Sequence, residues 1–197
     1  MNPVEALLAG ELVILPTDTV YGLCASPAGP VPTRRLYAAK GRDRDKPSAL
    51  LAADLDGLLA CIPELDPRAQ AITRALLPGP FTLVVSNPAG RCPWIAGTTP
   101  QAIGVRVPVL PETARVVVAA VGCVVATSAN AAGGADPRRV EDVPASVRAA
   151  AAAVVDAGEL PGTPSTVLDV TGPAPRVIRE GAVPAAAALE RALAALA

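Results

Sequence analysis

The stretch KGRDRDK, residues 40–46, places four cations and two carboxylates within seven residues. Guanidinium and ammonium groups bind phosphate oxygens well, and arginine offers a planar pair of donors. Gly41 lets the chain turn sharply, so Lys40 and Arg42 can face the same way. Two interpretations stay open: a phosphate-binding loop, or a solvated loop whose charges pair with one another. Neither GxxxxGK[ST] nor GxGxxG, two common phosphate-binding glycine motifs, occurs in the chain.

Small hydrogen-bonding side chains lie at the ends of two predicted strands. The stretch PTDTVYG, residues 16–22, follows an apolar strand and includes Thr19. It is either an ordinary polar turn or a lip that holds a small polar ligand. The stretch ATSANAAGG, residues 126–134, leaves a second strand through Ser128 and Asn130 into a glycine-rich loop. Hydroxyls and free backbone N–H groups at such a strand end commonly bind phosphate or carboxylate.

Three further polar residues lie in or beside apolar strands. Arg106 interrupts the apolar run IGVRVP, where an unpaired buried charge would be very costly. Arg106 therefore either forms a structural ion pair or serves a ligand. Ser165 begins one predicted strand, and Arg179 lies near the end of the next. Cations and hydroxyls at element ends favour catalysis by positioning and charge neutralisation, as in phosphoryl or nucleotidyl transfer.

The composition excludes several classes of chemistry. The chain has no histidine, so Ser-His-Asp and Cys-His catalysis are excluded. Any proton transfer must use a carboxylate, a lysine, water or a group of the substrate. A net charge of −1 and only four aromatic residues argue against strong nucleic-acid binding. The cysteines form no CxxC pair, so we expect free thiols and no zinc ribbon at Cys24, Cys61, Cys92 and Cys123.

Length and hydropathy are typical of one globular domain that does not enter a membrane. A chain of 197 residues can bury a substantial core, and we expect a single domain over residues 1–197 with its core at about 5–182. No apolar run reaches the roughly 18 residues of a membrane-spanning helix. The N-terminus lacks the basic start of a signal peptide. We therefore expect a cytoplasmic protein.

Apolar segments that alternate with turn signals predict an α/β fold. Strands are expected at 11–15, 20–25, 48–52, 81–86, 102–107, 123–128, 153–158, 165–170 and 175–180. Helices are expected at 2–10, 33–40, 54–60, 67–77, 111–121, 144–151 and 184–196. Consecutive strands without a helix between them, near the C-terminus, favour a mixed sheet over a purely parallel one.

The order of these motifs resembles the YrdC/TsaC family of threonylcarbamoyl-AMP synthases. The motifs are PTDTVYGL, KGRDRDKP, PGPFTLVV, GVRVP, TSAN and STVLDVT followed by RVIREG. The resemblance covers about residues 5–182, and the length resembles that of single-domain members. It implies an α/β fold with a twisted mixed sheet, flanked by helices and with a positively charged concave face. It also implies that L-threonine, bicarbonate and ATP, with Mg²⁺, give threonylcarbamoyl-AMP and pyrophosphate, the first step toward the t6A modification of tRNA.

The resemblance implies phosphate-binding roles for the basic loop and the strand end after it. Lys40 and Arg42 match the K-x-R signature of the family and would be the catalytic cations that face ATP. Lys46 also matches a position linked to ATP. Ser128 and Asn130 match the S-x-N signature, which binds ATP. The metal ligands stay undetermined, because the two aspartates of the loop either hold the cations in place or ligate Mg²⁺.

The resemblance links three residues to threonine and one more to ATP. Thr19, Arg106 and Ser165 match threonine-linked positions, and Arg106 would partner the carboxylate of the amino acid. Arg179 matches a position linked to ATP. Two positions depart from the family pattern. Leu51 stands where some members have histidine near the threonine, and Ala102 stands where a threonine often contacts ATP.

Alternative functions stay open. YrdC-like domains have also been regarded as double-stranded RNA or tRNA binders without catalysis, which needs only shape and cations. Carbamoyl transfer, as in related domains of hydrogenase-maturation proteins, is disfavoured by the short chain and the absence of CxxC pairs. An inactive homologue is disfavoured by the intact K-x-R and S-x-N signatures. As a synthase, the protein would pass its product to the next transferase of the t6A pathway.

Overall fold

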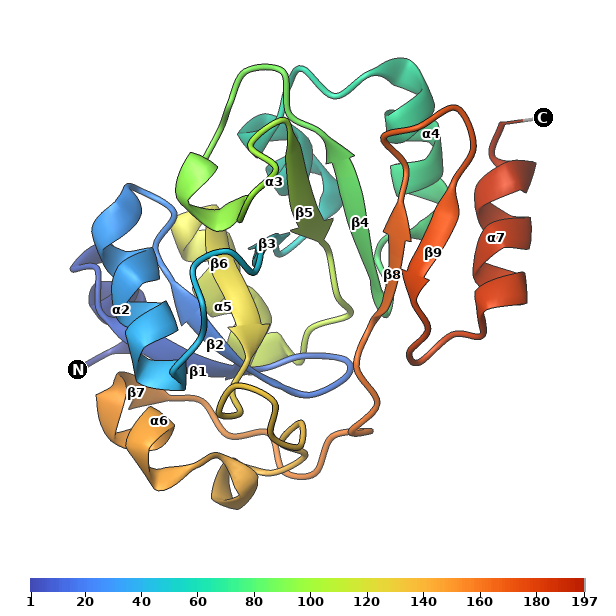
Figure 1. The fold of residues 1–197 in the computed structure, drawn as a ribbon. Coiled ribbons are helices and arrows are strands. Elements are labelled where there is room, and N and C mark those ends of the chain that lie inside the picture. Colours follow the sequence, from blue (N-terminus) through green and yellow to red (C-terminus); the bar gives the residue numbers. More distant parts are fainter. Residues whose placement is uncertain (197) are drawn as a thin grey trace.

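The computed structural model describes residues 1–196, which form one nine-stranded sheet with helices on both faces (Figure 1). The strands are β1 (Leu12–Pro16), β2 (Tyr21–Ala25), β3 (Ala49–Ala52), β4 (Phe81–Ser86), β5 (Ala102–Arg106), β6 (Cys123–Ser128), β7 (Ala151–Val154), β8 (Thr166–Asp169) and β9 (Arg176–Arg179). The α-helices are α1 (Pro3–Leu8), α2 (Pro30–Lys40), α3 (Leu55–Cys61), α4 (Pro67–Leu76), α5 (Glu112–Val121), α6 (Ala145–Ala150) and α7 (Ala185–Ala194).

The sheet is mixed, as the sequence predicts. Its strands lie in the order β7-β1-β2-β6-β3-β5-β4-β8-β9. The pairs β1–β7, β3–β5 and β4–β8 are parallel, and the other neighbouring pairs are antiparallel. This arrangement brings the C-terminal hairpin β8–β9 against β4, so segments from both halves of the chain share one sheet. The predicted α/β fold class, a mixed sheet flanked by helices, is confirmed.

One strand differs from its predicted position by more than one residue at each end. We expect a strand at 153–158, whereas β7 covers Ala151–Val154 directly after α6. The alanine-rich segment in which α6 ends and β7 begins has no side-chain pattern that marks the boundary between helix and strand. Parallel pairing decides the boundary instead, because Leu12 of β1 pairs with Ala151. The following Asp156 then turns the chain, and its carboxylate accepts from the backbone N–H of Gly158 at 2.8 Å.

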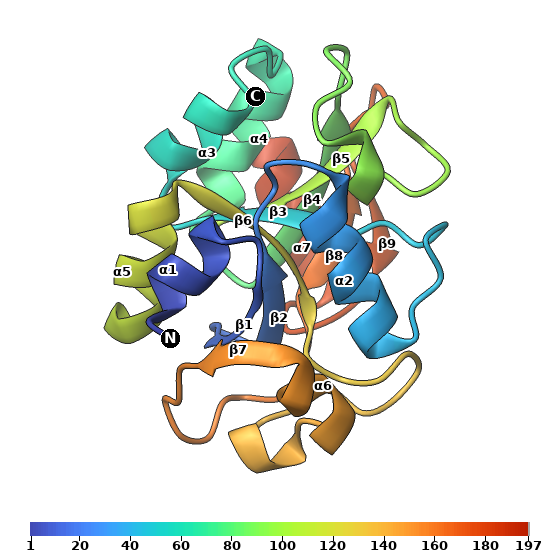
Figure 2. The same ribbon diagram turned by 90° about the vertical axis from the view of Figure 1, so that its left-hand side faces the viewer.

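Two apolar layers pack on opposite faces of the sheet. Five helices, namely α2, α3, α4, α6 and α7, pack on one face in the larger core cluster. On the other face α1 and α5 pack side by side over β1, β2, β3 and β6, as Figure 2 shows. The strands β4, β5, β8 and β9 contribute no buried residue to this second cluster among residues 1–196. Part of the second face therefore lacks helical cover, and this part holds the candidate site.

No helix in the described part of the chain combines the length and apolarity that crossing a membrane requires.

Candidate functional site

A cavity of about 610 Å³ lies over the uncovered part of the sheet. Strand alternation decides which side chains reach it. Thr82 of β4 and Arg106 of β5 face the cavity, while their neighbours Leu83 and Val105 are fully buried in the core on the opposite face. Leu51 of β3 pairs with Arg106 in the sheet and packs under α1 and α5, so the cavity continues the face that those helices leave open.

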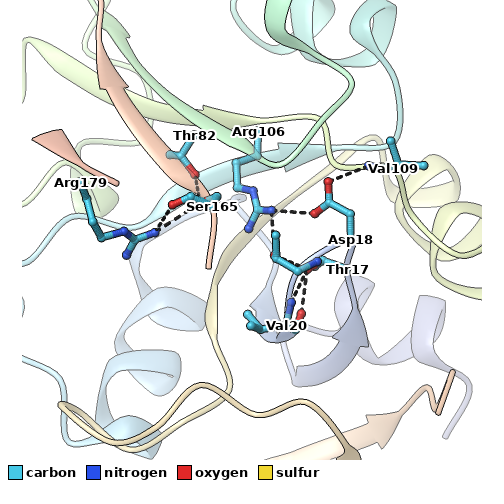
Figure 3. A network of polar contacts seen from close by, with 9 residues as sticks. Thr17, Asp18, Val20, Thr82, Arg106, Val109, Ser165 and Arg179 are labelled. Carbon is cyan, nitrogen blue, oxygen red and sulfur yellow. Dashed lines mark hydrogen bonds and ion pairs between the residues drawn. The ribbon is translucent and has the colours of Figure 1, made fainter. Parts of the chain in front are cut away.

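Arg106 lines the cavity and is held there by a carboxylate and a hydroxyl. Its Nη2 atom donates to Asp18 Oδ1 at 3.0 Å, as Figure 3 shows, and to Thr19 Oγ1 at 3.2 Å. Asp18 also accepts from the backbone N–H of Val109 at 3.2 Å. Burial raises the pKa of the Asp18 carboxyl, and the Arg106 charge acts against that rise. Arg106 thus forms an ion pair and also lines the cavity, so both alternatives from the sequence apply.

Thr17 organises the turn that presents Asp18 and Thr19. Its hydroxyl donates to the carbonyl of Val20 at 2.7 Å and accepts from the backbone N–H groups of Thr19 and Val20, both at 3.2 Å. Thr17 Oγ1 also lies 3.0 Å from Thr19 Oγ1. Both threonines are almost completely buried. The stretch is therefore a well-bonded polar turn, and its second threonine contacts the arginine of the cavity.

A second network joins β4, the segment before β8, and β9. Ser165 Oγ lies 2.8 Å from Thr82 Oγ1. Arg179 Nη2 donates to the Ser165 carbonyl at 2.7 Å and to its hydroxyl at 3.3 Å (Figure 3). All three side chains line the cavity. The partners of Arg179 are neutral oxygens, so this guanidinium keeps its full positive charge toward the cavity.

Lys40 sits behind the wall of the cavity, at the last residue of α2. Gly41 ends that helix in the left-handed conformation, with φ 61°, which suits a residue without Cβ. Lys40 Nζ donates to the carbonyl of Ser128 and, at 2.7 Å, to Asn130 Oδ1. Asn130 Oδ1 also accepts from the Ser128 hydroxyl at 2.7 Å. The K-x-R and S-x-N segments, far apart in the sequence, are thus joined directly.

Lys40 is only 3% exposed, and this burial changes its protonation. Burial lowers the pKa of its ammonium group to about 8, with a further contribution from the nearby Arg42 charge, while Asp136 acts in the opposite direction. Asn130 Nδ2 donates to Asp136 Oδ1 at 3.3 Å and to the Gly134 carbonyl at 2.6 Å. The glycine-rich loop thereby fixes the amide that holds the lysine.

The basic loop divides into an inner and an outer part. Arg42 lines the cavity, and its Nη2 atom donates to the Pro47 carbonyl at 2.7 Å. Lys46 is exposed and does not line the cavity. None of the ion pairs among residues 1–196 includes Asp43 or Asp45. Self-pairing of the loop charges is therefore absent from this structure.

Several buried polar atoms at the cavity have no hydrogen-bond partner. These atoms, among those of residues 1–196, are Arg42 Nε, Ser48 Oγ and Arg106 Nε, and all three residues line the cavity. A buried donor without a partner costs about 1–3 kcal/mol, so such groups are rare unless a ligand or water satisfies them. Their gathering at one cavity indicates a site that binds a polar ligand.

The cavity lining carries a net positive charge. Four arginines face two aspartates there, and the arginines are Arg42, Arg106, Arg176 and Arg179. One of the aspartates, Asp169, already accepts from Arg176 at 2.8 Å. In the described part of the chain, no group of three or more histidine, cysteine, aspartate or glutamate side chains could hold a metal ion. The site can therefore hold anions together, and any divalent cation would depend mainly on oxygens of the ligand.

Several residues of the site were not predicted from the sequence. Thr17, Thr82 and Asp136 were missed as site residues, and Asp18 was not identified as the partner of Arg106. Thr82 offered one signal, because it is a polar residue inside an apolar strand. Of the two departures from the family pattern, Ala102 lines the cavity, whereas Leu51 is buried under the α1–α5 layer.

The chain is similar to a known protein family and to named relatives within it. The Sua5/YciO/YrdC family model, described as "Telomere recombination", matches residues 5–181. A Mycobacterium tuberculosis protein, designated provisionally as a threonylcarbamoyl-AMP synthase, is 34% identical over 187 residues, with 93% of this chain and 84% of the relative covered. The threonylcarbamoyl-AMP synthase of Pyrococcus abyssi is 30% identical over 176 residues, covering 89% of this chain and 52% of the relative.

The fold is also similar to a solved structure with a bound amino acid. The crystal structure of P. abyssi Sua5 complexed with L-threonine matches with a TM-score of 0.86 and 29% identity, covering 95% of this chain. The match covers 55% of the P. abyssi chain, so the present chain spans little more than half of that protein. Escherichia coli YciO, at 22% identity and a TM-score of 0.79, shares the fold.

Proposed function

The chain belongs to the Sua5/YciO/YrdC family, and we propose that it is a threonylcarbamoyl-AMP synthase, a nucleotidyltransferase that uses L-threonine, bicarbonate and ATP. Relatives with that name in archaea and bacteria, and the threonine complex of P. abyssi Sua5, support the proposal. The observation that carries it is the cavity itself, where two groups of residues differ in charge. One group suits the zwitterion threonine, and the other suits the polyanion ATP. We call them the Arg106 end (Asp18, Thr19 and Arg106) and the Lys40 end (Lys40, Arg42, Ser128 and Asn130).

The Arg106 end fits an amino-acid zwitterion. Arg106 uses Nη2 for Asp18 and Thr19, and its Nε atom is buried without a partner. A carboxylate oxygen of threonine would satisfy this orphaned donor. Asp18 balances the arginine charge, so the pair is neutral overall, like the ligand. The hydroxyls of Thr19 and Ser165 are the groups that we assign to the remaining polar atoms of threonine.

The Lys40 end fits a nucleoside triphosphate. Lys40 and Arg42 bring two positive charges, and the Asp136 carboxylate acts on the charge of Lys40. Arg179 adds a third cation from β9, and its charge further lowers the pKa of Arg42, which burial has already lowered. Cations that lack a carboxylate partner are the ones that phosphate oxygens stabilise most. We therefore assign Lys40, Arg42, Ser128, Asn130 and Arg179 to ATP, with Lys46 as an outer contact.

The reaction needs positioning more than it needs a nucleophile from the protein. The amine of threonine attacks the carbon of bicarbonate, and water leaves as the carbamate forms. A carbamate oxygen then attacks the α-phosphorus of ATP, and pyrophosphate leaves. Both steps bring anions together, so catalysis consists of charge neutralisation and alignment by Arg106, Lys40 and Arg42. A chain without histidine can supply all of these groups.

Magnesium fits this proposal as a companion of ATP. Mg²⁺ is usually bound through one or two carboxylates together with phosphate oxygens of the substrate and water. Asp136 is the carboxylate of the cavity lining that lies beside the Lys40 end, and it would hold such an ion. When bound with ATP, the ion would neutralise charge on the phosphates. The product would pass to the next transferase of the t6A pathway and then to tRNA, and we place this work in the cytoplasm.

Pyrophosphate release tests the proposed function directly. Release from ATP and Mg²⁺ is measured with threonine or bicarbonate omitted in turn, for wild type and Lys40→Ala. We expect release that requires both co-substrates and falls at least about a hundredfold in the variant, as when one strong electrostatic contact is lost. Arg115→Ala is the matched control, since Arg115 is exposed and pairs only with Glu112 on α5. Absence of threonine-dependent release from folded protein would overturn the proposal, and salt-sensitive RNA binding would then favour the RNA-binding module.

A further inference from the structure

Three of the four cysteines gather at a second cavity of about 470 Å³, separate from the candidate site. Cys61, Cys92 and Cys123 line it together with Arg91, and none of its lining residues lines the first cavity. All four cysteines are free thiols. The three that line this cavity come from the end of α3, the segment after β4, and the start of β6. The fold therefore brings together thiols that are widely separated in the sequence.

Two of these thiols are in direct contact. Cys61 Sγ and Cys123 Sγ lie 2.9 Å apart. The helix that carries Cys61 also packs beside the residue before Cys123, since a Cβ placed on Gly57 of α3 would lie 3.7 Å from the carbonyl oxygen of Gly122. A disulfide requires a sulfur–sulfur distance of about 2.05 Å, so a small closing movement would let the pair form a covalent bond.

The two thiols differ in acidity, because their surroundings shift their pKa values in opposite directions. The hydrogen bond between Cys61 and Cys123 lowers the pKa of the Cys61 thiol, and the nearby Arg91 charge lowers it further, although burial acts in the opposite direction. The same contact raises the pKa of Cys123. Cys24 provides the contrast, because complete burial raises its pKa to about 12. Thiolates are the reactive form of cysteine, so Cys61 is the attacking group of the pair.

We propose that Cys61 and Cys123 form a dithiol site that is oxidised by low-molecular-weight disulfides. The Cys61 thiolate attacks one sulfur of the small disulfide, the bond between its two sulfurs breaks, and one small thiolate leaves. Cys123 then loses its proton and attacks Cys61, which forms the protein disulfide and releases the second small thiol. The protein dithiol is oxidised by two electrons, and the small disulfide is reduced to two thiols.

The surroundings of the pair leave room for such a reagent, because both thiols line a cavity of about 470 Å³. Arg91 lies at the same cavity and is exposed, and its charge is paired with Glu64, which accepts from it at 2.5 Å. Cys92 faces the same cavity, and its Sγ atom donates to the Pro27 carbonyl at 3.9 Å. Burial raises the pKa of Cys92, and a negative charge on Cys61 raises it further. Cys92 is therefore a bystander in the reaction and serves as the matched control.

Exposure of the intact protein to glutathione disulfide tests this site, with intact mass and peptide mapping as the readouts. We expect wild type to lose the mass of two hydrogen atoms through a Cys61–Cys123 link, and dithiothreitol to reverse the change. The Cys123→Ser variant should stop at a glutathione adduct on Cys61. The Cys61→Ser variant should react at least roughly tenfold more slowly than wild type. The Cys92→Ser and Cys24→Ser variants should behave like wild type.

Three outcomes would overturn the inference. Wild type would stop at a stable glutathione adduct, or the mapped link would include Cys92, or Cys61→Ser would react at the wild-type rate. Circular dichroism of each variant before treatment separates a lost thiol from a lost fold. The outcome does not depend on the proposed synthase activity, because the readouts are masses and not turnover.

Discussion

The two ends of the cavity handle positive charge in opposite ways. At the Arg106 end, the guanidinium is matched by the Asp18 carboxylate at 3.0 Å. At the Lys40 end, Lys40 donates to a carbonyl and an amide oxygen, and Arg42 donates to the Pro47 carbonyl. These direct partners satisfy hydrogen bonds without cancelling charge, although the Asp136 carboxylate acts on Lys40 from nearby. The Arg106 end therefore holds a neutral ion pair and the Lys40 end holds cations with neutral direct partners. Burial, and then the Arg179 charge, lowers the pKa of both Arg106 and Arg42.

This difference explains how a chain with a net charge of −1 can suit a strongly anionic substrate. The positive charge is local, and it is kept by giving cations neutral hydrogen-bond partners. On the proposed assignment, the neutral ion pair of the Arg106 end is the part that suits a zwitterion. The contrast also predicts that substitutions at the two ends will affect different substrates.

Replacing Arg106 should produce the largest effect. In Arg106→Leu we expect kcat/KM for threonine to fall about 10²–10³-fold, because a charge-assisted contact is lost and Asp18 is left without its partner. KM for ATP should change less than about threefold. Arg106→Lys keeps the charge beside Asp18 but loses the planar pair of donors, so its kcat/KM for threonine should lie between the values of wild type and Arg106→Leu. Steady-state kinetics with each substrate varied in turn checks this, and an equal loss for both substrates would break the comparison.

Replacing Arg42 should affect the other substrate, with a smaller effect. In Arg42→Ala we expect KM for ATP to rise about tenfold, which is the usual contribution of one hydrogen bond to a charged group. KM for threonine should stay near the wild-type value. Titration of a non-hydrolysable ATP analogue into wild type and variant measures the change without turnover. Unchanged affinity for the analogue would remove Arg42 from the ATP site.

Lys40 should make the binding of ATP depend on pH. Burial lowers the pKa of Lys40 from 10.5 to about 8, so the free protein loses this positive charge as the pH rises through about 8. We expect the affinity for the ATP analogue to fall severalfold above that pH in wild type, and to stay flat in Lys40→Arg. A pH series of binding titrations checks this, and parallel curves for the two proteins would contradict it.

The same pKa shift should make the protein more stable as the pH rises, whereas it should make ATP binding weaker. The unfolded chain binds a proton at Lys40 up to its ordinary pKa of 10.5, whereas the folded chain releases it at about 8. Between these values the unfolded state binds more protons, so the free energy of unfolding rises with pH. Below about pH 8 the full penalty for the buried charge is present. Urea unfolding is measured for wild type and Lys40→Met across this pH window. The free energy of unfolding of wild type, relative to that of Lys40→Met, should rise with pH.

Replacing Lys46 should produce the smallest effect. Its side chain is exposed and lies outside the cavity lining, so a contact with ATP would be screened by water. In Lys46→Ala we expect KM for ATP to rise by no more than about threefold. A loss as large as that of Arg42→Ala would mean that the basic loop moves when ATP binds.

Local patterns in the sequence predicted most of the fold. The apolar runs at 81–86 and 123–128 give the bounds of β4 and β6 without error, because turn residues mark both ends. The alanine-rich segment before β7 gave no such mark, and sheet pairing placed that strand two residues earlier than predicted. Sequence periodicity reports the local chain, whereas this boundary depends on β1, which lies far away in the sequence.

The sequence predicted several residues of the site, but it did not predict which of them contact one another. Polar residues at strand ends identified Thr19, Ser128 and Ser165 as candidates. The structure places Ser128 and Ser165 in the cavity lining, and Thr19 contacts Arg106 of that lining. The ion pair of Asp18 with Arg106 joins residues 88 positions apart, and so does the bond of Lys40 with the Ser128 carbonyl. Neither residue type nor spacing encodes such pairing, which follows from the strand order. The roles of the individual residues in binding stay predictions until the variants are measured.

The contrast between the two ends is tested most directly by the salt dependence of binding to the wild-type protein. Calorimetric titrations of L-threonine and of the ATP analogue are compared at low and high ionic strength. Because added salt screens uncompensated charge, we predict that the affinity for the ATP analogue falls on the order of tenfold, while the affinity for threonine changes less than about twofold. Equal salt dependence for the two ligands would contradict the assignment of a neutral threonine end and a cationic ATP end.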